Sequence, residues 1–192
     1  MKGSDLFSLC DDKEWPEVRK YLSSDAAEER KKSNIMYRND DDYGTCLHQA
    51  FIRGAPDDIM KAMLNIGGKE LVMKVDIYHD TVLNTACIKF ASYDIIKTLI
   101  EVGGKDLVMA KNKCGYTALQ WLCIAIKTHI KATEKIKLIL QAGDDTLLLS
   151  AKNIFGQTPL EIVTDKGASN IIKKLLAVQQ MMMEEEGEAA RA

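Results

Sequence analysis

The sequence lacks the features that mark a membrane protein or a nucleic-acid-binding protein. No uninterrupted apolar run approaches about 18 residues, the length that a transmembrane helix needs, so we expect no membrane span. Basic residues are not in excess, because 26 Lys and Arg stand against 28 Asp and Glu and the formal net charge is -2. Nucleic acids attract a stripe of uncompensated basic side chains, so the sequence predicts no nucleic-acid partner.

Cysteine and histidine are also too sparse to indicate a disulfide framework or a metal site. The five cysteines are odd in number and form no Cys-x-x-Cys pair: Cys10, Cys46, Cys87, Cys114 and Cys123. This pattern fits a reducing compartment, and the chain begins without a secretory apolar run, so the predicted location is the cytoplasm, or the cytoplasm and nucleus. The three histidines join no recurring cluster of ligands or nucleophiles, and we predict no catalytic residue, metal or cofactor.

What the sequence has instead is an internal repeat. Residues 67–73 read GGKELVM and residues 103–109 read GGKDLVM, an offset of 103 − 67 = 36 residues. A Thr-x-Leu motif recurs at Thr45, Thr81, Thr117 and Thr158, in steps of 36, 36 and 41 residues. A fixed period of this size is the signature of a protein built from stacked repeat units.

Each unit carries two helical patterns. One helix is predicted to begin at Thr-x-Leu, and a second apolar stripe at i, i+3 and i+4 follows it, as at Ile96, Leu99 and Ile100. Glycines at Gly67, Gly103 and Gly143 are predicted to end the second helix, and the Lys-Glu/Asp-Leu-Val-Met segment is read as an extra piece of loop. A single helix pair cannot bury its apolar stripe, so we expect one cooperative stack.

The repeat divides the chain into six segments. Residues 1–39 are predicted to form an N-terminal capping helix pair with a charged connector. Three repeats follow at 40–75, 76–111 and 112–152, the last with an insertion within 124–134. Residues 153–180 form a C-terminal capping repeat, and 181–192 a flexible acidic tail.

The motif resembles the ankyrin repeat, whose pattern is a turn with Asp and Gly followed by Thr-Pro-Leu-His. The segments 153–160 (NIFGQTPL) and 112–119 (NKCGYTAL) are the most similar to it, and the first unit keeps Thr45-Cys46-Leu47-His48. The resemblance implies an all-α fold, a solenoid of stacked helix-turn-helix pairs with projecting β-turn fingers. His79 takes the glycine slot of the second turn, so that turn is expected to be distorted.

The same resemblance implies a protein-protein interaction module that binds an unknown protein partner through its finger tips and concave helix face. The predicted partner-binding residues at those positions are Asp42, Tyr78, Asp80, Lys113, Tyr116, Trp121, Phe155 and Gln157. Exposed aromatic side chains in a row, here Tyr78, Tyr116, Trp121 and Phe155, are typical interface anchors. The alternative is that Ile77, Phe155 and Trp121 pack between fingers and only stiffen the stack. The alternative function is self-association of the aromatic face into a homo-oligomer. The acidic turn at 40–42 could meet a basic rim of a partner, but a solvated turn is the favoured interpretation.

Overall fold

The computed structural model describes residues 2–38, 44–125, 132–165 and 170–189, and within these ranges the fold is all-α. The only β-type pairings there are isolated bridges, at Arg38–Thr45 and Val75–Thr81. The helices are α1 (Gly3–Asp11), α2 (Trp15–Leu22), α3 (Glu28–Ile35), α4 (Cys46–Arg53), α5 (Asp57–Val72), α6 (Val82–Ile88), α7 (Tyr93–Met109), α8 (Ala118–Ala125), α9 (Ala132–Ala142), α10 (Asp145–Ser150), α11 (Pro159–Asp165) and α12 (Asn170–Ala189). The all-α prediction is confirmed for the described residues. None of their helices is both long and apolar enough to cross a bilayer.

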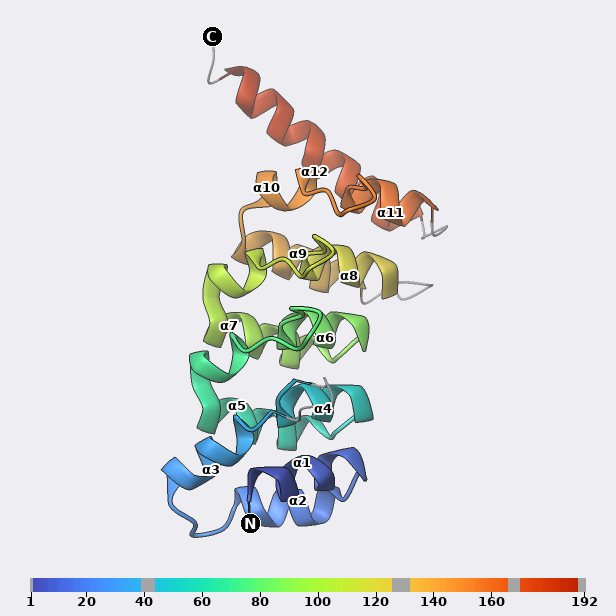
Figure 1. The fold of residues 1–192 in the computed structure, drawn as a ribbon. Coiled ribbons are helices and arrows are strands. Elements are labelled where there is room, and N and C mark those ends of the chain that lie inside the picture. Colours follow the sequence, from blue (N-terminus) through green and yellow to red (C-terminus); the bar gives the residue numbers. More distant parts are fainter. Residues whose placement is uncertain (1, 39–43, 126–131, 166–169, 190–192) are drawn as a thin grey trace.

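The helices stack in successive layers along the length of the molecule (Figure 1). Helices α1, α4, α6, α8 and α11 contact one another in that order and form one row. Helices α2, α5, α7, α9 and α12 contact one another in the same way and form a second row. The apolar pairs of the sequence repeat lie between these layers, where Met63, Leu64 and Leu99 are fully or almost fully buried. Each layer therefore buries its stripe against the layers on both sides.

The GGKELVM and GGKDLVM segments are helical, which corrects the prediction that they are loops. Helix α5 bends at Gly68, which has a φ of +54°, and then continues through a short helical turn to Val72. Helix α7 bends in the same way at Gly104, with a φ of +68°. Only glycine takes such left-handed angles without steric cost, so the second glycine of the pair reverses the chain and the next residues begin a new turn.

This short turn is a third helix of the unit, and it has counterparts at both ends of the array. Leu71 and Val72 of α5, and Leu107 and Val108 of α7, are all fully buried. Helix α10 occupies the corresponding place after α9, and α3 the place after α2. The predicted charged connector of the N-terminal unit is thus partly helical, because Ile35 on α3 is buried and supplies the apolar contact that fixes it.

Salt bridges connect these short helices from one unit to the next. Lys32 pairs with Glu70 at 3.0 Å, Lys69 with Asp106 at 3.1 Å, and Lys105 with Asp144 at 3.3 Å. In each pair the lysine comes from the earlier unit and the acid from the later one. Because these pairs are exposed, each adds little to stability, and their regular direction is their main structural feature.

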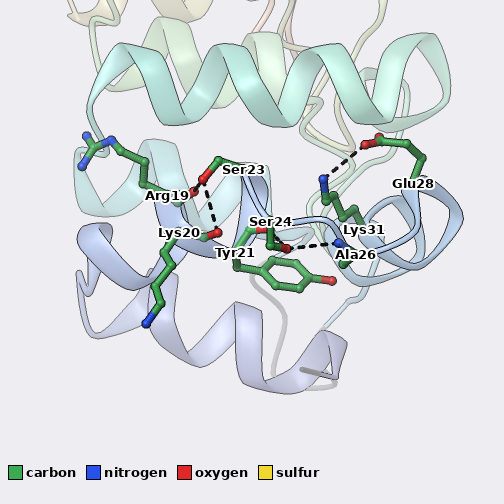
Figure 2. A network of polar contacts seen from close by, with 8 residues as sticks. All are labelled: Arg19, Lys20, Tyr21, Ser23, Ser24, Ala26, Glu28 and Lys31. Atoms are coloured by element: carbon green, nitrogen blue, oxygen red, sulfur yellow. Dashed lines mark hydrogen bonds and ion pairs between the residues drawn. The ribbon is translucent and has the colours of Figure 1, made fainter.

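The turn between α2 and α3 is held by a local polar network (Figure 2). The hydroxyl of Ser24 donates to the carbonyl of Tyr21 at 2.7 Å and accepts a hydrogen bond from the backbone N–H of Ala26. The amide of Asn34 donates to the phenolic oxygen of Tyr21 at 2.7 Å, and Lys31 pairs with Glu28 at 3.2 Å. These contacts position α3 against the rest of the N-terminal unit.

A polar slot on the first helix of each unit ties some neighbouring units together. In His48, Nδ1 accepts from the backbone N–H of Thr45 at 3.1 Å and Nε2 lies 3.2 Å from the carbonyl oxygen of Asp80, in the next unit. Gln120 makes the equivalent pair of contacts: Oε1 accepts from Thr117 N–H, and Nε2 donates to the carbonyl of Gln157. These two side chains thus reach the backbone of the next unit.

The other two residues in this slot bond only within their own unit. Asn84 is shorter by one methylene than Gln120, and its amide donates to the carboxylate of Asp80 at 3.0 Å. Glu161 accepts from the backbone N–H and hydroxyl of Thr158 at 2.6 and 2.8 Å, which caps its own helix. Among the described residues, the polar slot therefore connects neighbouring units only at His48 and Gln120.

Two predicted segments, the tail at 181–192 and the insertion in the 112–152 repeat, lie partly outside the described residues. Helix α12 extends to Ala189, so residues 181–189 are helical rather than the flexible tail predicted for 181–192. The predicted insertion in the 112–152 repeat coincides largely with residues 126–131, which lie outside the described residues. Helices α8 and α9 flank it, ending at Ala125 and beginning at Ala132.

Candidate functional site

The loops between units share one hydrogen-bonding pattern in the second, third and fourth units. In each loop a side-chain oxygen accepts two backbone N–H groups, two and four residues further along. Asp76 accepts from Tyr78 and Asp80 at 2.8 and 2.9 Å. Asn112 and Asn153 make the same two contacts in their loops, at 2.9 and 3.0 Å each. Asp and Asn favour this geometry because their short side chains reach the backbone just ahead of them.

Asp76 makes these contacts from a half-buried position. Burial raises the pKa of its carboxyl group, and the nearby Asp80 carboxylate raises it further, while the hydrogen bonds from the two backbone N–H groups act in the opposite direction. Asn112 and Asn153 hold the same place without a charge. The neutral amides of Asn112 and Asn153 accept the same hydrogen bonds without burying a charge. The Asp76 loop differs from the other two in that its acceptor is a carboxylate whose burial costs free energy.

The turn that contains His79 is not distorted, contrary to expectation. His79 adopts a φ of +61°, close to the values of +73° and +75° at Gly115 and Gly156 in the equivalent slots. Its backbone N–H donates to the carbonyl of Asp76 at 3.1 Å, as the corresponding glycines do in their loops. The surrounding hydrogen bonds thus hold a non-glycine residue in a left-handed conformation that costs energy.

Adjacent loops are also bonded to each other through their backbones. The N–H of Lys113 donates to the carbonyl of Tyr78 at 2.9 Å, and the N–H of Ile154 donates to the carbonyl of Cys114 at 3.0 Å. The three loops therefore form a connected row. Side chains at the loop tips are held on a rigid base, which is a favourable arrangement for binding.

Asp80 does not sit at an exposed tip, which corrects its predicted placement. Its side chain is buried, with an exposed fraction of 6%. One carboxylate oxygen accepts hydrogen bonds from the Nδ2 atoms of Asn84 and Asn112, at 3.0 and 2.9 Å, and from Nε1 of Trp121 at 3.0 Å. These donors come from α6, the next loop and α8, so Asp80 is a structural tie between the second and third units.

The predicted aromatic track separates into exposed and packed members. Tyr78 and Phe155 are exposed, with exposed fractions of 62% and 70%. Tyr116 and Trp121 are half-buried and stacked on each other, with ring centroids 4.7 Å apart and an interplanar angle of 25°. The packing alternative does not hold for Phe155, which is exposed, whereas Trp121 packs against Tyr116.

A hollow of about 290 Å³ lies beside these residues, over α8 and α11. It is lined by Tyr116, Ile124, Phe155, Gln157, Ile162 and Asp165. The Nε2 of Gln157 donates to the carboxylate of Asp165 at 2.8 Å across this lining. The structure thus brings together Tyr116, Phe155 and Gln157 from the predicted set, with Trp121 packed behind Tyr116.

The sequence analysis missed Ile124 and Asp165. Ile124 lies three residues after the predicted Trp121 on α8, and Asp165 lies three residues after Ile162 on α11. Residues at i and i+3 lie on the same side of a helix, so extending the predicted face of α8 by one turn would have found Ile124. Of the remaining predicted residues, Lys113 is exposed beside the Tyr78 loop, and Asp42 lies outside the described residues.

Compared with models of known protein families, the chain matches none. It has no significant match among curated proteins. A function for this chain must therefore be argued from the residues themselves, since a fold alone does not specify one.

Proposed function

We propose that this chain is a non-catalytic protein-protein interaction module of the ankyrin type. The observation that carries the proposal is the row of hydrogen-bonded loops with Tyr78 and Phe155 exposed at the tips. Aromatic side chains on one row of loops suit an interface, which uses them as anchors with little conformational entropy to lose. On this proposal the loops act as β-turn fingers, and the partner also contacts the face of α8 and α11.

The layered helices support the ankyrin-type assignment. Each unit has a Thr that begins its first helix, and Thr81 accepts the backbone N–H of Asn84 at 3.3 Å as a helix cap should. The left-handed turn before that Thr recurs in the same slot of three units. The chain departs from the family pattern in its short third helix, which lengthens the period to 36 residues. The loops of the second, third and fourth units still bond to one another through their backbones.

A role in binding rather than catalysis also fits the chemistry of the described residues. The most buried thiols, such as Cys87 and Cys123, have pKa values raised by burial, which disfavours the reactive thiolate. The buried His48 is engaged on both ring nitrogens by backbone groups and by the Thr45 hydroxyl. We propose a cytoplasmic location for the module on the basis of its five unpaired thiols.

The test is affinity capture from a lysate with two matched variants. The first, Tyr78→Ala/Phe155→Ala, removes the two exposed loop aromatics. The second, Leu147→Ala/Val178→Ala, removes two exposed apolar side chains that belong to α10 and α12 and not to the loops. Because all four side chains are exposed, both variants should keep the wild-type circular dichroism spectrum and melting temperature.

A protein partner that is retained by wild type and by the α10/α12 variant, and lost only by the loop variant, supports the proposal. A partner that survives the loop variant places binding elsewhere and refutes the assignment of the site. Light scattering on the wild-type chain alone distinguishes the self-association alternative. A mass that rises with concentration in wild type and not in the loop variant would assign the aromatic face to a homo-oligomer instead.

A further inference from the structure

The hollow over α8 and α11 combines aromatic walls with a single acidic group. Tyr116 and Phe155 supply two rings, Ile124 and Ile162 supply aliphatic surface, and Asp165 supplies the one charged side chain among the lining residues. Aromatic faces attract cations through their negative quadrupole, and a carboxylate attracts them through its charge. The aromatic rings and the carboxylate both favour a cation, and the aliphatic surface favours an apolar stem. The expected ligand is therefore an organic cation with an apolar stem.

Of the two polar carboxyl and amide side chains in the lining, Gln157 is already engaged, and the Asp165 carboxylate is the charged group that can recognise a ligand. The Nε2 of Gln157 donates to one oxygen of Asp165, and the Oε1 of Gln157 accepts from Nδ2 of Asn153 at 3.4 Å. Gln157 is thus committed at both ends to protein groups and acts as a strut that orients Asp165. The second carboxylate oxygen and the outer lone pair of the first can accept hydrogen bonds from an incoming group.

The size of the hollow restricts the occupant further. Sites for drug-sized ligands and cofactors span about 300–1,000 Å³, and this hollow lies at the lower limit of that range. It suits one long side chain of a protein partner better than a cofactor. Between the two cationic side chains, the planar guanidinium both stacks on aromatic rings and binds a carboxylate through two parallel N–H groups, whereas an ammonium does neither as well.

We propose that this hollow receives an arginine side chain of the protein partner. The guanidinium stacks against the rings of Tyr116 and Phe155 and donates to the carboxylate of Asp165, while its methylene stem contacts Ile124 and Ile162. The inference rests on the proposed function and names the chemistry that the partner must present. The stacked pair of Tyr116 and Trp121, tied to Asp80 through the indole N–H, keeps one wall of the hollow in place before binding.

The experiment is a methyl NMR titration of the full chain with isoleucine Cδ1 labelled. The probes are N-acetyl-arginine methylamide and its citrulline analogue, which has the same shape and no charge. Ile124 and Ile162 report on the hollow, and the buried Ile59 of α5 reports on distant effects. We expect saturable shifts at Ile124 and Ile162 with the arginine probe, at least about fivefold weaker affinity for the citrulline probe, and no shift at Ile59.

Two variants isolate the carboxylate. Asp165→Asn keeps an oxygen that can accept from Gln157, so the lining stays in place while the charge is lost. Asp106→Asn removes an equal charge from the outer short helix of α7, where the acid pairs with Lys69. The first variant should lower affinity for the arginine probe about fivefold and leave the citrulline probe unchanged, and the second should change neither.

Equal shifts from the arginine and citrulline probes, an Asp165→Asn variant that binds arginine as well as wild type, or no saturable shift at Ile124 and Ile162 would each overturn the inference. Those results leave the capture experiment untouched. A partner lost through Tyr78→Ala/Phe155→Ala while the arginine probe fails to bind means that the loop face binds a protein without an arginine in this hollow. The failure of the inference and the failure of the proposed function are therefore separate observations.

Discussion

The polar tie at His48 predicts that the stability of the fold falls as the pH is lowered from 7 to 5. Because Nδ1 accepts the backbone N–H of Thr45, the neutral ring must carry its proton on Nε2, which then donates to the carbonyl of Asp80. Protonation of Nδ1 would place two N–H groups against each other in a buried site. Burial is the largest effect on this ring and lowers the pKa of His48 to about 4.

The direction and size of the effect follow from this shift. A histidine in the unfolded chain has a pKa of about 6.5, so the unfolded state takes up a proton first as the pH falls. The stabilisation is fully present above about pH 6.5 and is lost progressively as the pH falls toward 4. Integrating the difference in proton binding between pH 7 and pH 5 gives a loss of about 2 kcal/mol in the free energy of unfolding.

The variant His48→Gln isolates this contribution, because Gln120 already occupies the same slot in the third unit. We expect the glutamine to make both backbone contacts without titrating, so its urea midpoint should change less than that of wild type between pH 7 and pH 5. The exposed residue His79 provides the control: His79→Asn removes a histidine and keeps a residue that tolerates a positive φ. Carboxylates that titrate in this range affect all three proteins alike and cancel in the comparison.

Urea unfolding followed by circular dichroism at four pH values measures all three proteins. If wild type and His48→Gln lose the same stability between pH 7 and pH 5, the ring does not titrate as its buried contacts require, and the reasoning is refuted. The same conclusion follows if the His79→Asn control abolishes the pH dependence.

Three further predictions concern the ties between units. Asp80→Ala leaves three donors without their shared acceptor and should lower the free energy of unfolding by about 3–5 kcal/mol, measured in urea; a loss below about 1 kcal/mol would contradict the role of the carboxylate. Gly68→Ala places a Cβ at a φ of +54° and should lower the free energy of unfolding by about 1–2 kcal/mol through backbone strain alone, since nothing lies close to that Cβ. Gly143→Ala is the comparison, because there an added Cβ would meet the side chain of Leu148. With Ellman's reagent, we expect one rapidly reacting thiol in the native chain, lost in Cys114→Ser, and five thiols in denaturant; rapid reaction of a second native thiol would show that the layers open readily.

The repeating periodicity of the sequence was enough to predict the all-α fold and the two rows of helices. Apolar residues at helical spacing, such as Ile96 and Leu99, bury their stripe wherever a neighbouring helix is available, so local pattern and global packing agree. The short third helix was missed because GGKELVM contains two glycines, which are read as a break. The break is real at Gly68, but Leu71 and Val72 gain enough apolar burial to restore a helical turn immediately afterwards.

The candidate site was only partly predictable. The loop residues could be aligned from unit to unit, which located Tyr78 and Phe155 at the tips. Asp80 looked like another tip residue because its position is next to a turn, and nothing in the local sequence shows that three donors from other elements converge on it. Contacts between segments 32 to 41 residues apart depend on how the layers stack, and such contacts are not visible in a local pattern.

The row of lysine-to-acid pairs on the short helices gives the array a direction. The units 40–75 and 76–111 each present an acid toward the unit before them and a lysine toward the unit after them, as Glu70 and Lys69 do in α5. The two sides of a unit are therefore complementary to each other and not to themselves. A copied 36-residue segment such as 76–111, inserted after residue 111, would meet a matching partner on both of its sides. The same charges would oppose a unit that entered in the reverse orientation. The lysine-to-acid pairs therefore favour joining the units in one order, and they place no upper limit on the number of units.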